Sequence, residues 1–217
     1  MTKEKTPLDI AEGLVAKARR HRSTGLDLSG IQLSTLPESF GRLTQLQSLY
    51  LGGNQLSTLP ESLGQLTQLQ VLDLSGNELN TLPESVKQLL QLRELRLRVN
   101  QLTTLPESLG QLTNLQVLDL SGNRLSKLPE SLGRLKQLQI LNLSDNQLCI
   151  LPKALRRLEQ LQALFVHGND GLGFPAEVLG PTWQEVLFQH KPTAKPSELL
   201  TYYFRVRFTR WPKVRGG

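Results

Sequence analysis

Residues 69–83 read Leu69-Gln-Val-Leu72-Asp-Leu74-Ser-Gly-Asn77-Glu-Leu79-Asn-Thr-Leu82-Pro83, and six other copies of this stretch can be aligned along the chain. Its proline recurs every 23 residues without a slip, at Pro37, Pro60, Pro83, Pro106, Pro129, Pro152 and Pro175. A fixed period of this length indicates a stacked-repeat architecture, and the spacing L-x-x-L-x-L-x-x-N-x-L indicates its type. The sequence therefore predicts one solenoid of seven turns over residues 23–182.

The second turn illustrates how one repeat should fold. Leu49 and Leu51 are two residues apart, so they point to one face of a short strand, whereas Tyr50 points to the other. The alternation ends at Asn54, where the chain must turn. Pro60 has a fixed φ and lacks an N–H, which suits the first position of a short helix or 3-10 turn.

Two further positions belong to this turn. A glutamate follows the proline in five repeats, where a negative charge suits the positive end of a short helix; these are Glu38, Glu61, Glu84, Glu107 and Glu130. Turn spacing explains them without a catalytic role. Gly64 is expected to let the chain leave the turn at little conformational cost.

Stacking is required for stability. Each turn directs seven leucine-type side chains inward, and burying each is worth about 1.5–3 kcal/mol. Ordering the backbone costs roughly 1–2 kcal/mol per residue, so a single turn cannot fold. Stacked turns can, because each closes the interior of its neighbour.

These motifs resemble the leucine-rich repeat family in its 23-residue L-x-x-L-P form. The resemblance implies an α/β horseshoe with a parallel sheet on the concave face and short helical or 3-10 turns on the convex face. It also implies that a column of asparagines bonds the backbone of adjacent turns, which a buried amide needs; the column comprises Asn54, Asn77, Asn100, Asn123, Asn146 and Asn169.

Composition bounds the compartment. Cys149 is the single cysteine, so no intramolecular disulfide can form, whereas extracellular leucine-rich repeat proteins usually have cysteine-paired caps. No apolar run follows the N-terminus, and no apolar stretch approaches the length of a membrane span, about 18 residues. We therefore expect a protein of the reducing cytoplasm.

The two ends predict caps. Residues 1–22 should form an N-terminal capping helix over 7–20, with Thr6 as N-cap and Pro7 at the first helical position. Residues 183–217 form a C-terminal cap and basic tail, in which a cluster is expected to cover the last core; it comprises Trp183, Val186, Leu187 and Phe188. Helical spacing from Leu199 to Val206 favours a helix begun at Ser197, although the alternation of 204–208 also fits a strand.

The net charge of +6 belongs to the tail, because residues 191–217 hold seven Lys or Arg and one Glu. The solenoid is neutral, so the basic pI is no evidence that the solenoid binds nucleic acid. One interpretation of the tail is that it contacts nucleic acid or an anionic membrane. We favour the other interpretation, in which it is a docking helix with a solvated end.

Equivalent positions of stacked strands form columns on the concave face. The fourth turn departs from the others, since Glu94, Arg96, Arg98 and Val99 replace Val, Asp, Ser and Gly. Arg96 lies between Asp73 and Asp119, which predicts either a cross-strand charge ladder or a partner-binding centre; both can hold. We expect a protein partner to bind this face, whose two aromatic side chains should be exposed. The predicted contact residues are Tyr50, Asp73, Glu94, Arg96, Arg98, Asp119 and Phe165.

No catalytic chemistry emerges from the sequence. The three histidines, His21, His167 and His190, are dispersed, none has a cysteine at metal-ligand spacing, and no phosphate-binding glycine loop is present. The sequence thus predicts a non-enzymatic interaction module without cofactor or metal, such as a signalling scaffold.

The flanks suggest an alternative. Residues 11–33 and 176–207 resemble the entry to and exit from the repeat domain of bacterial Roco proteins, in which a Ras-like GTPase domain follows. This chain ends at Gly217 without a nucleotide-binding loop. The resemblance implies a regulatory repeat arm whose GTPase domain is missing from the chain, and it transfers no nucleotide-binding residue.

Overall fold

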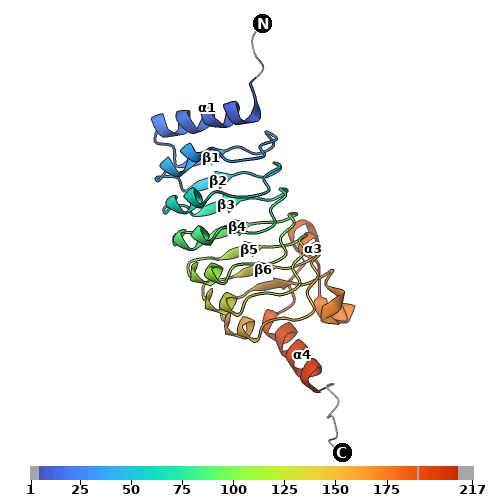
Figure 1. Ribbon diagram of the computed structural model, residues 1–217. Helices are drawn as coiled ribbons and strands as arrows, with labels where there is room; N and C mark the ends of the chain where they lie inside the picture. Colours follow the sequence, from blue (N-terminus) through green and yellow to red (C-terminus); the bar gives the residue numbers. More distant parts are fainter. Residues whose placement is uncertain (1–4, 190, 210–217) are drawn as a thin grey trace, which may run out of the picture.

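The computed structural model describes residues 5–189 and 191–209, which form a single stack of turns between two helical ends (Figure 1). Helix α1 spans Pro7–Arg20. The strands are β1 Gly25–Asp27, β2 Ser48–Tyr50, β3 Val71–Asp73, β4 Glu94–Arg96, β5 Val117–Asp119, β6 Ile140–Asn142 and β7 Ala163–Phe165. The 3-10 helices are η1 Glu38–Arg42, η2 Glu61–Gln65, η3 Glu84–Gln88, η4 Glu107–Gln111, η5 Glu130–Arg134, η6 Lys153–Arg157 and η7 Asp170–Leu172. The chain ends with α2 Ala176–Leu179, α3 Trp183–Gln189 and α4 Pro196–Thr209.

One parallel sheet runs the length of the stack, with its strands paired in sequence order from β1 to β7. Leu26 pairs with Leu49, and Leu49 with Leu72, so successive partners are 23 residues apart. These central leucines are buried, while the residues on either side of them point outward. The predicted leucine-rich repeat solenoid is confirmed.

The asparagine column holds the turns together. The Asn77 Oδ1 accepts a hydrogen bond from the Leu56 N–H at 3.0 Å, and its Nδ2 donates to the carbonyls of Leu51 and Leu74 at 3.0 Å each. The same pattern recurs from Asn54 to Asn169. Each buried amide is thus satisfied by backbone of two adjacent turns, which confirms its structural role.

The prolines and glutamates act at the 3-10 helices, with one difference from the prediction. Pro60 immediately precedes η2 in an extended conformation instead of occupying its first helical position. Three of the five glutamates reach beyond their own helix to the next one: Glu61 Oε2 accepts from the Ser85 N–H at 3.1 Å. Glu107 and Glu130 make the equivalent bonds to the next turn.

Gly64 serves a different purpose from the predicted one. Its φ is not in the left-handed region, so conformational freedom is not what the position requires. A Cβ there would instead lie 2.7 Å from the Ser85 Cβ and 2.8 Å from the Ser85 carbonyl oxygen. The glycine allows neighbouring 3-10 helices to approach closely.

The N-terminal end is closed by α1, as predicted. Thr6 and Asp9 form a reciprocal capping box at the start of this helix. Ala11, Val15 and Ala18 are buried and belong to the same core cluster as the first leucines. The helix therefore covers an interior that would otherwise face water.

The C-terminal end is closed by α4, where the predicted helix and not the alternative strand is found. Leu199, Leu200, Tyr203 and Phe204 are buried, and the Tyr203 hydroxyl accepts a hydrogen bond from the Leu151 N–H at 3.0 Å. The last part of the predicted basic tail, residues 210–217, lies outside the described residues. The Trp183–Phe188 cluster does not cover this end.

Candidate interaction surface

The concave face is defined here by the outward side chains of β1–β7 and by the residues just beyond them. Six of the seven predicted residues lie on strands: Tyr50 on β2, Asp73 on β3, Glu94 and Arg96 on β4, Asp119 on β5 and Phe165 on β7. Arg98 follows β4 by two residues. The regular register places all seven on this face, as the column arrangement predicted.

Arg96 makes two ion pairs at the centre of the face. Its Nη2 lies 2.7 Å from the Glu94 Oε2, and its Nη1 lies 3.9 Å from the Asp73 Oδ2. Asp119, the other expected partner, instead accepts hydrogen bonds from the Ser121 N–H and hydroxyl, at 3.0 and 2.7 Å. The predicted ladder is therefore one-sided, and exposed pairs of this kind contribute only about 0.2–1 kcal/mol.

The aspartates of the column have a local structural task. Asp27, Asp73 and Asp119 each accept a hydrogen bond from the N–H of the serine two residues later. The backbone and side-chain hydrogen bonds from Ser29 lower the pKa of Asp27 below its ordinary value. The β4 turn lacks this arrangement, because Arg96 and Arg98 occupy the two positions.

Backbone strain marks the same turn. Glycine occupies the left-handed position after most strands, for example Gly76 and Gly122, but Val99 adopts a φ of 53° there. A β-branched residue in this region is a conformational outlier, at a cost of roughly 1–2 kcal/mol. The Val99 side chain is nevertheless 54% exposed, so packing does not offset this cost.

The two predicted aromatic residues differ in accessibility. Tyr50 is 36% exposed on the open N-terminal half of the face. Phe165 was expected to be exposed, and this is wrong: only 2% of it is accessible. The Trp183 ring stands edge-on against it, with centroids 5.1 Å apart and an interplanar angle of 76°.

This contact shows where the predicted cap cluster lies. Trp183, at the start of α3, covers the outer face of β7 instead of the end of the last core. Phe188, from the same cluster, is 80% exposed, and Leu187 is also accessible. The prediction that these side chains close the core is wrong, because α4 already does so and α3 folds back over the sheet.

Polar contacts hold the start of α3. The Thr182 N–H donates to Glu185 Oε2 at 2.9 Å, and the Thr182 hydroxyl accepts from the Glu185 N–H. The hydrogen bond from Lys191 and those from Thr182 lower the pKa of Glu185 to about 2. The carboxylate is therefore charged at neutral pH. In this form it links Thr182, just before α3, to Lys191, which follows the helix.

Between α3 and the sheet lies a hollow of about 210 Å3, which we call the α3 pocket. Its lining includes Arg98, Asn142, Ser144, His167 and Trp183. Sequence reasoning missed four of these as site residues. The repeat pattern could have indicated two of them, because Asn142 stands where three other repeats have Asp and His167 stands where four others have Ser. It could not have indicated the wall that α3 forms, because α3 lies outside the repeats.

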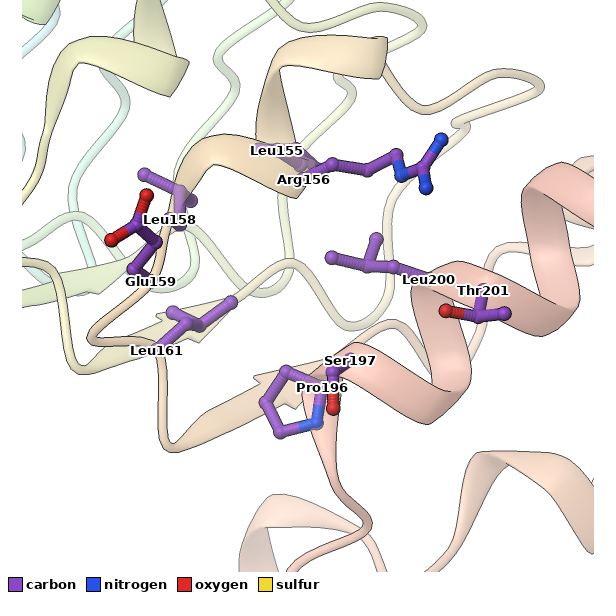
Figure 2. A pocket seen from close by; sticks show the side chains of 9 residues that line it. All are labelled: Leu155, Arg156, Leu158, Glu159, Leu161, Pro196, Ser197, Leu200 and Thr201. Atoms are coloured by element: carbon purple, nitrogen blue, oxygen red, sulfur yellow. The ribbon is translucent and has the colours of Figure 1, made fainter.

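A second hollow, of about 410 Å3, lies between η6 and α4. Figure 2 shows Pro196 and Leu200 from α4 opposite Leu158 and Leu161 from the last repeats. Arg156 also lines this hollow, and its guanidinium lies 5.9 Å from the centre of the Phe204 ring, a cation–π distance. This hollow follows the line along which α4 docks on the stack.

Two further features are absent from residues 5–189 and 191–209. No group of three or more His, Cys, Asp or Glu side chains in this part is arranged to hold a metal ion. Nor does any helix there combine the length and apolar character needed to traverse a bilayer.

The fold and the columns define a repeat protein with an open sheet face. The family model for the leucine-rich repeat region matches residues 26–121 and 71–173, and the chain belongs to this family. Leucine-rich repeat domains generally mediate protein–protein interactions. No curated protein sequence matches the chain significantly.

Solved structures agree with this assignment. A leucine-rich repeat protein of Leptospira interrogans is 40% identical, with a TM-score of 0.65 over 70% of this chain and 38% of that one. The repeat domain of the type III effector XopL is 30% identical, with a TM-score of 0.69 over 76% of this chain and 59% of that one. The effector YopM of Yersinia pestis is 29% identical, with a TM-score of 0.64 over 77% of this chain and 44% of that one. The chain thus spans less than two thirds of each of these structures.

Proposed function

We propose that this chain is a non-enzymatic interaction module that binds a protein partner on its concave face, centred on the β4 turn. The observation that carries the proposal is the concentration of departures in that turn. Glu94, Arg96, Arg98 and Val99 replace the common residues there, and Val99 adopts a left-handed conformation. Neither packing nor repeat geometry requires these changes.

Arg98 supports a binding role most directly. Its side chain is exposed and forms no ion pair within the described part of the chain. Arginine is favoured at protein interfaces because its planar fork forms several hydrogen bonds at once. The proposed surface extends to Tyr50, Asp73, Glu94, Arg96 and Asp119, whereas buried Phe165 serves to seat α3.

A relative gives a precedent for the class of ligand. The structure of the plant peptide hormone receptor RGFR1 was determined in complex with RGF2, and it is 34% identical over 62% of this chain, with a TM-score of 0.57. This chain spans 22% of that receptor. The likeness supports a peptide or protein as the bound partner.

The test is affinity purification with the intact chain and with the Arg96→Ala/Arg98→Ala variant. We expect the variant to lose a partner that the wild type retains, with unchanged thermal unfolding. Arg42→Ala/Arg134→Ala is the matched control, since both arginines lie on 3-10 helices away from the sheet. Equal recovery of the partner by both double variants would reject the proposed surface.

The regulatory arm of a Roco-type GTPase remains the alternative for the same surface. The resemblance of residues 11–33 and 176–207 to the flanks of that repeat domain supports it. Its test is GTP hydrolysis by a Roco GTPase domain from the same genome, with this chain added in trans. A saturable change in rate supports the alternative, and a constant rate excludes it.

A further inference from the structure

Two buried polar atoms in the α3 pocket have no hydrogen-bond partner among residues 5–189 and 191–209: the Ser144 hydroxyl oxygen and the His167 Nδ1. Ser144 is only 7% exposed, so its hydroxyl is shielded from bulk water. Buried polar groups normally have partners, and leaving one unpaired is costly. Four serine hydroxyls on the 3-10 helices are unpaired as well, but they line neither hollow described above, whereas Ser144 and His167 both line the α3 pocket and are open to a ligand there.

The free hydroxyl arises from one substitution along the column. In the preceding turn the Ser121 hydroxyl donates to the Asp119 Oδ1 at 2.7 Å. In the next turn Asn142 replaces the aspartate, and its Oδ1 accepts only the Ser144 N–H, at 3.1 Å. The Ser144 hydroxyl consequently retains its proton for an acceptor in the pocket.

His167 presents the complementary requirement. Its Nε2 lies 3.1 Å from the Gly180 carbonyl oxygen, which can only accept, so Nε2 carries the proton. With that proton on Nε2, the imidazole Nδ1 presents a lone pair that a donor can fill. Ser144 and His167 occupy equivalent positions on neighbouring turns. Their backbones are therefore one strand spacing apart, about 4.8 Å.

Charge selects a neutral ligand. Arg98 and Asp145 both line the pocket and carry opposite charges, so neither sign is favoured overall. A carboxamide supplies one N–H donor and one carbonyl acceptor without net charge, and the Trp183 ring offers an apolar wall beside it. A carboxylate would accept from Ser144 but would offer Nδ1 no donor unless the imidazole took up a proton, and the glutamate probe described below tests that case.

We propose that the α3 pocket binds a carboxamide, whose N–H donates to the His167 Nδ1 and whose oxygen accepts from the Ser144 hydroxyl. This deepens the proposed function and rests on it in one respect: the carboxamide comes from an Asn or Gln side chain of the protein bound on the concave face. The rest of that partner lies along the sheet toward β4.

The pocket can be tested without the partner. The background is Trp211→Phe, which leaves Trp183 as the only tryptophan of the chain. The probes are N-acetylglutamine methylamide, its glutamate counterpart and the apolar norvaline counterpart. Binding of each probe is measured by Trp183 fluorescence and by the nitrogen chemical shifts of the His167 ring. We expect saturable changes with the glutamine probe and binding at least about threefold weaker with the others, as expected for a lost hydrogen bond.

Variants make the test specific. Ser144→Ala removes a hydroxyl without partners in the described structure, so the fold should persist while affinity for the glutamine probe falls about three- to tenfold. Ser75→Ala, at the equivalent position two turns after Ser29, is the matched control and should bind normally. No saturable response, as when ordered water fills the pocket, or equal response to all probes, overturns the proposal.

The same variants separate this proposal from the proposed function. Failure of the glutamine probe rejects the pocket while leaving the Arg96→Ala/Arg98→Ala result intact. If the probe binds but Ser144→Ala retains the partner at full affinity, the carboxamide does not come from that partner, and the link to the concave-face ligand is wrong.

Discussion

The Trp183 ring stands edge-on against Phe165, with their centroids 5.1 Å apart, and this contact turns the C-terminal segment back onto the sheet. It divides the concave face into an open part around β2–β4 and a covered part at β7. The open part holds Tyr50 and Arg96, the covered part holds the α3 pocket, and Arg98 lies at the boundary because it lines that pocket. Segments far apart in sequence, such as Arg98 and Trp183, therefore line one hollow.

Replacing Trp183 with alanine should release α3 and expose Phe165. An aromatic pair contributes about 0.5–1.5 kcal/mol beyond its buried area, so the free energy of unfolding should fall by at least that amount. Urea denaturation followed by circular dichroism measures it. Phe188→Ala on the same helix is the control and should change stability by less than about 0.5 kcal/mol. Similar losses in both variants would contradict the docking role of Trp183.

Acid should loosen the same segment. Glu185 has a pKa of about 2, below its ordinary value of 4.5, because Lys191 and Thr182 bond its charged form. A depressed carboxyl pKa stabilises the folded state above the ordinary value, and this contribution is lost as the pH falls from about 4.5 to 2. Trp183 fluorescence in the Trp211→Phe background should report a transition in that window. The transition should disappear in Glu185→Gln, and its persistence there would assign it to another group.

The asparagine column should be intolerant of substitution. Asn123→Ala leaves the Leu102 N–H and the carbonyls of Leu97 and Leu120 without their side-chain partner. An unsatisfied buried group costs about 1–3 kcal/mol, so thermal unfolding should shift to markedly lower temperature. Asn114→Ala, which removes one exposed hydrogen bond to the Leu90 carbonyl, should have a small effect. Equal shifts for the two variants would refute the column's role.

Two glycine substitutions should have opposite effects. A Cβ on Gly110 would lie 2.4 Å from the Ser131 carbonyl oxygen, so Gly110→Ala should destabilise the fold by about 1–3 kcal/mol. A Cβ on Gly13, inside α1, meets no atom within 4 Å. Gly13→Ala should therefore stabilise the fold by about 0.5–1 kcal/mol through helix propensity. Chemical denaturation of both variants checks the signs, and destabilisation by Gly13→Ala would show that α1 does not remain helical.

The predicted register of the strands was confirmed where the stack is regular. The period placed Asp73, Glu94 and Arg96 on neighbouring strands of one face, because strands of equal spacing must stay in register. It failed at Asp119 as a partner of Arg96, since the Ser121 hydroxyl bonds that carboxylate in addition to the Ser121 N–H. It failed again at Phe165, because a column pattern describes only the sheet and not what folds over it.

The sequence by itself determined the solenoid, since leucines at a fixed period can bury their side chains only by stacking, and buried asparagines then need the backbone of adjacent turns. It also determined which residues face outward from each strand. Only the tertiary structure decided where the C-terminal helices dock. That choice depends on the fit of Trp183 against Phe165 and of Tyr203 against the last turn, and these contacts join residues that no local pattern relates.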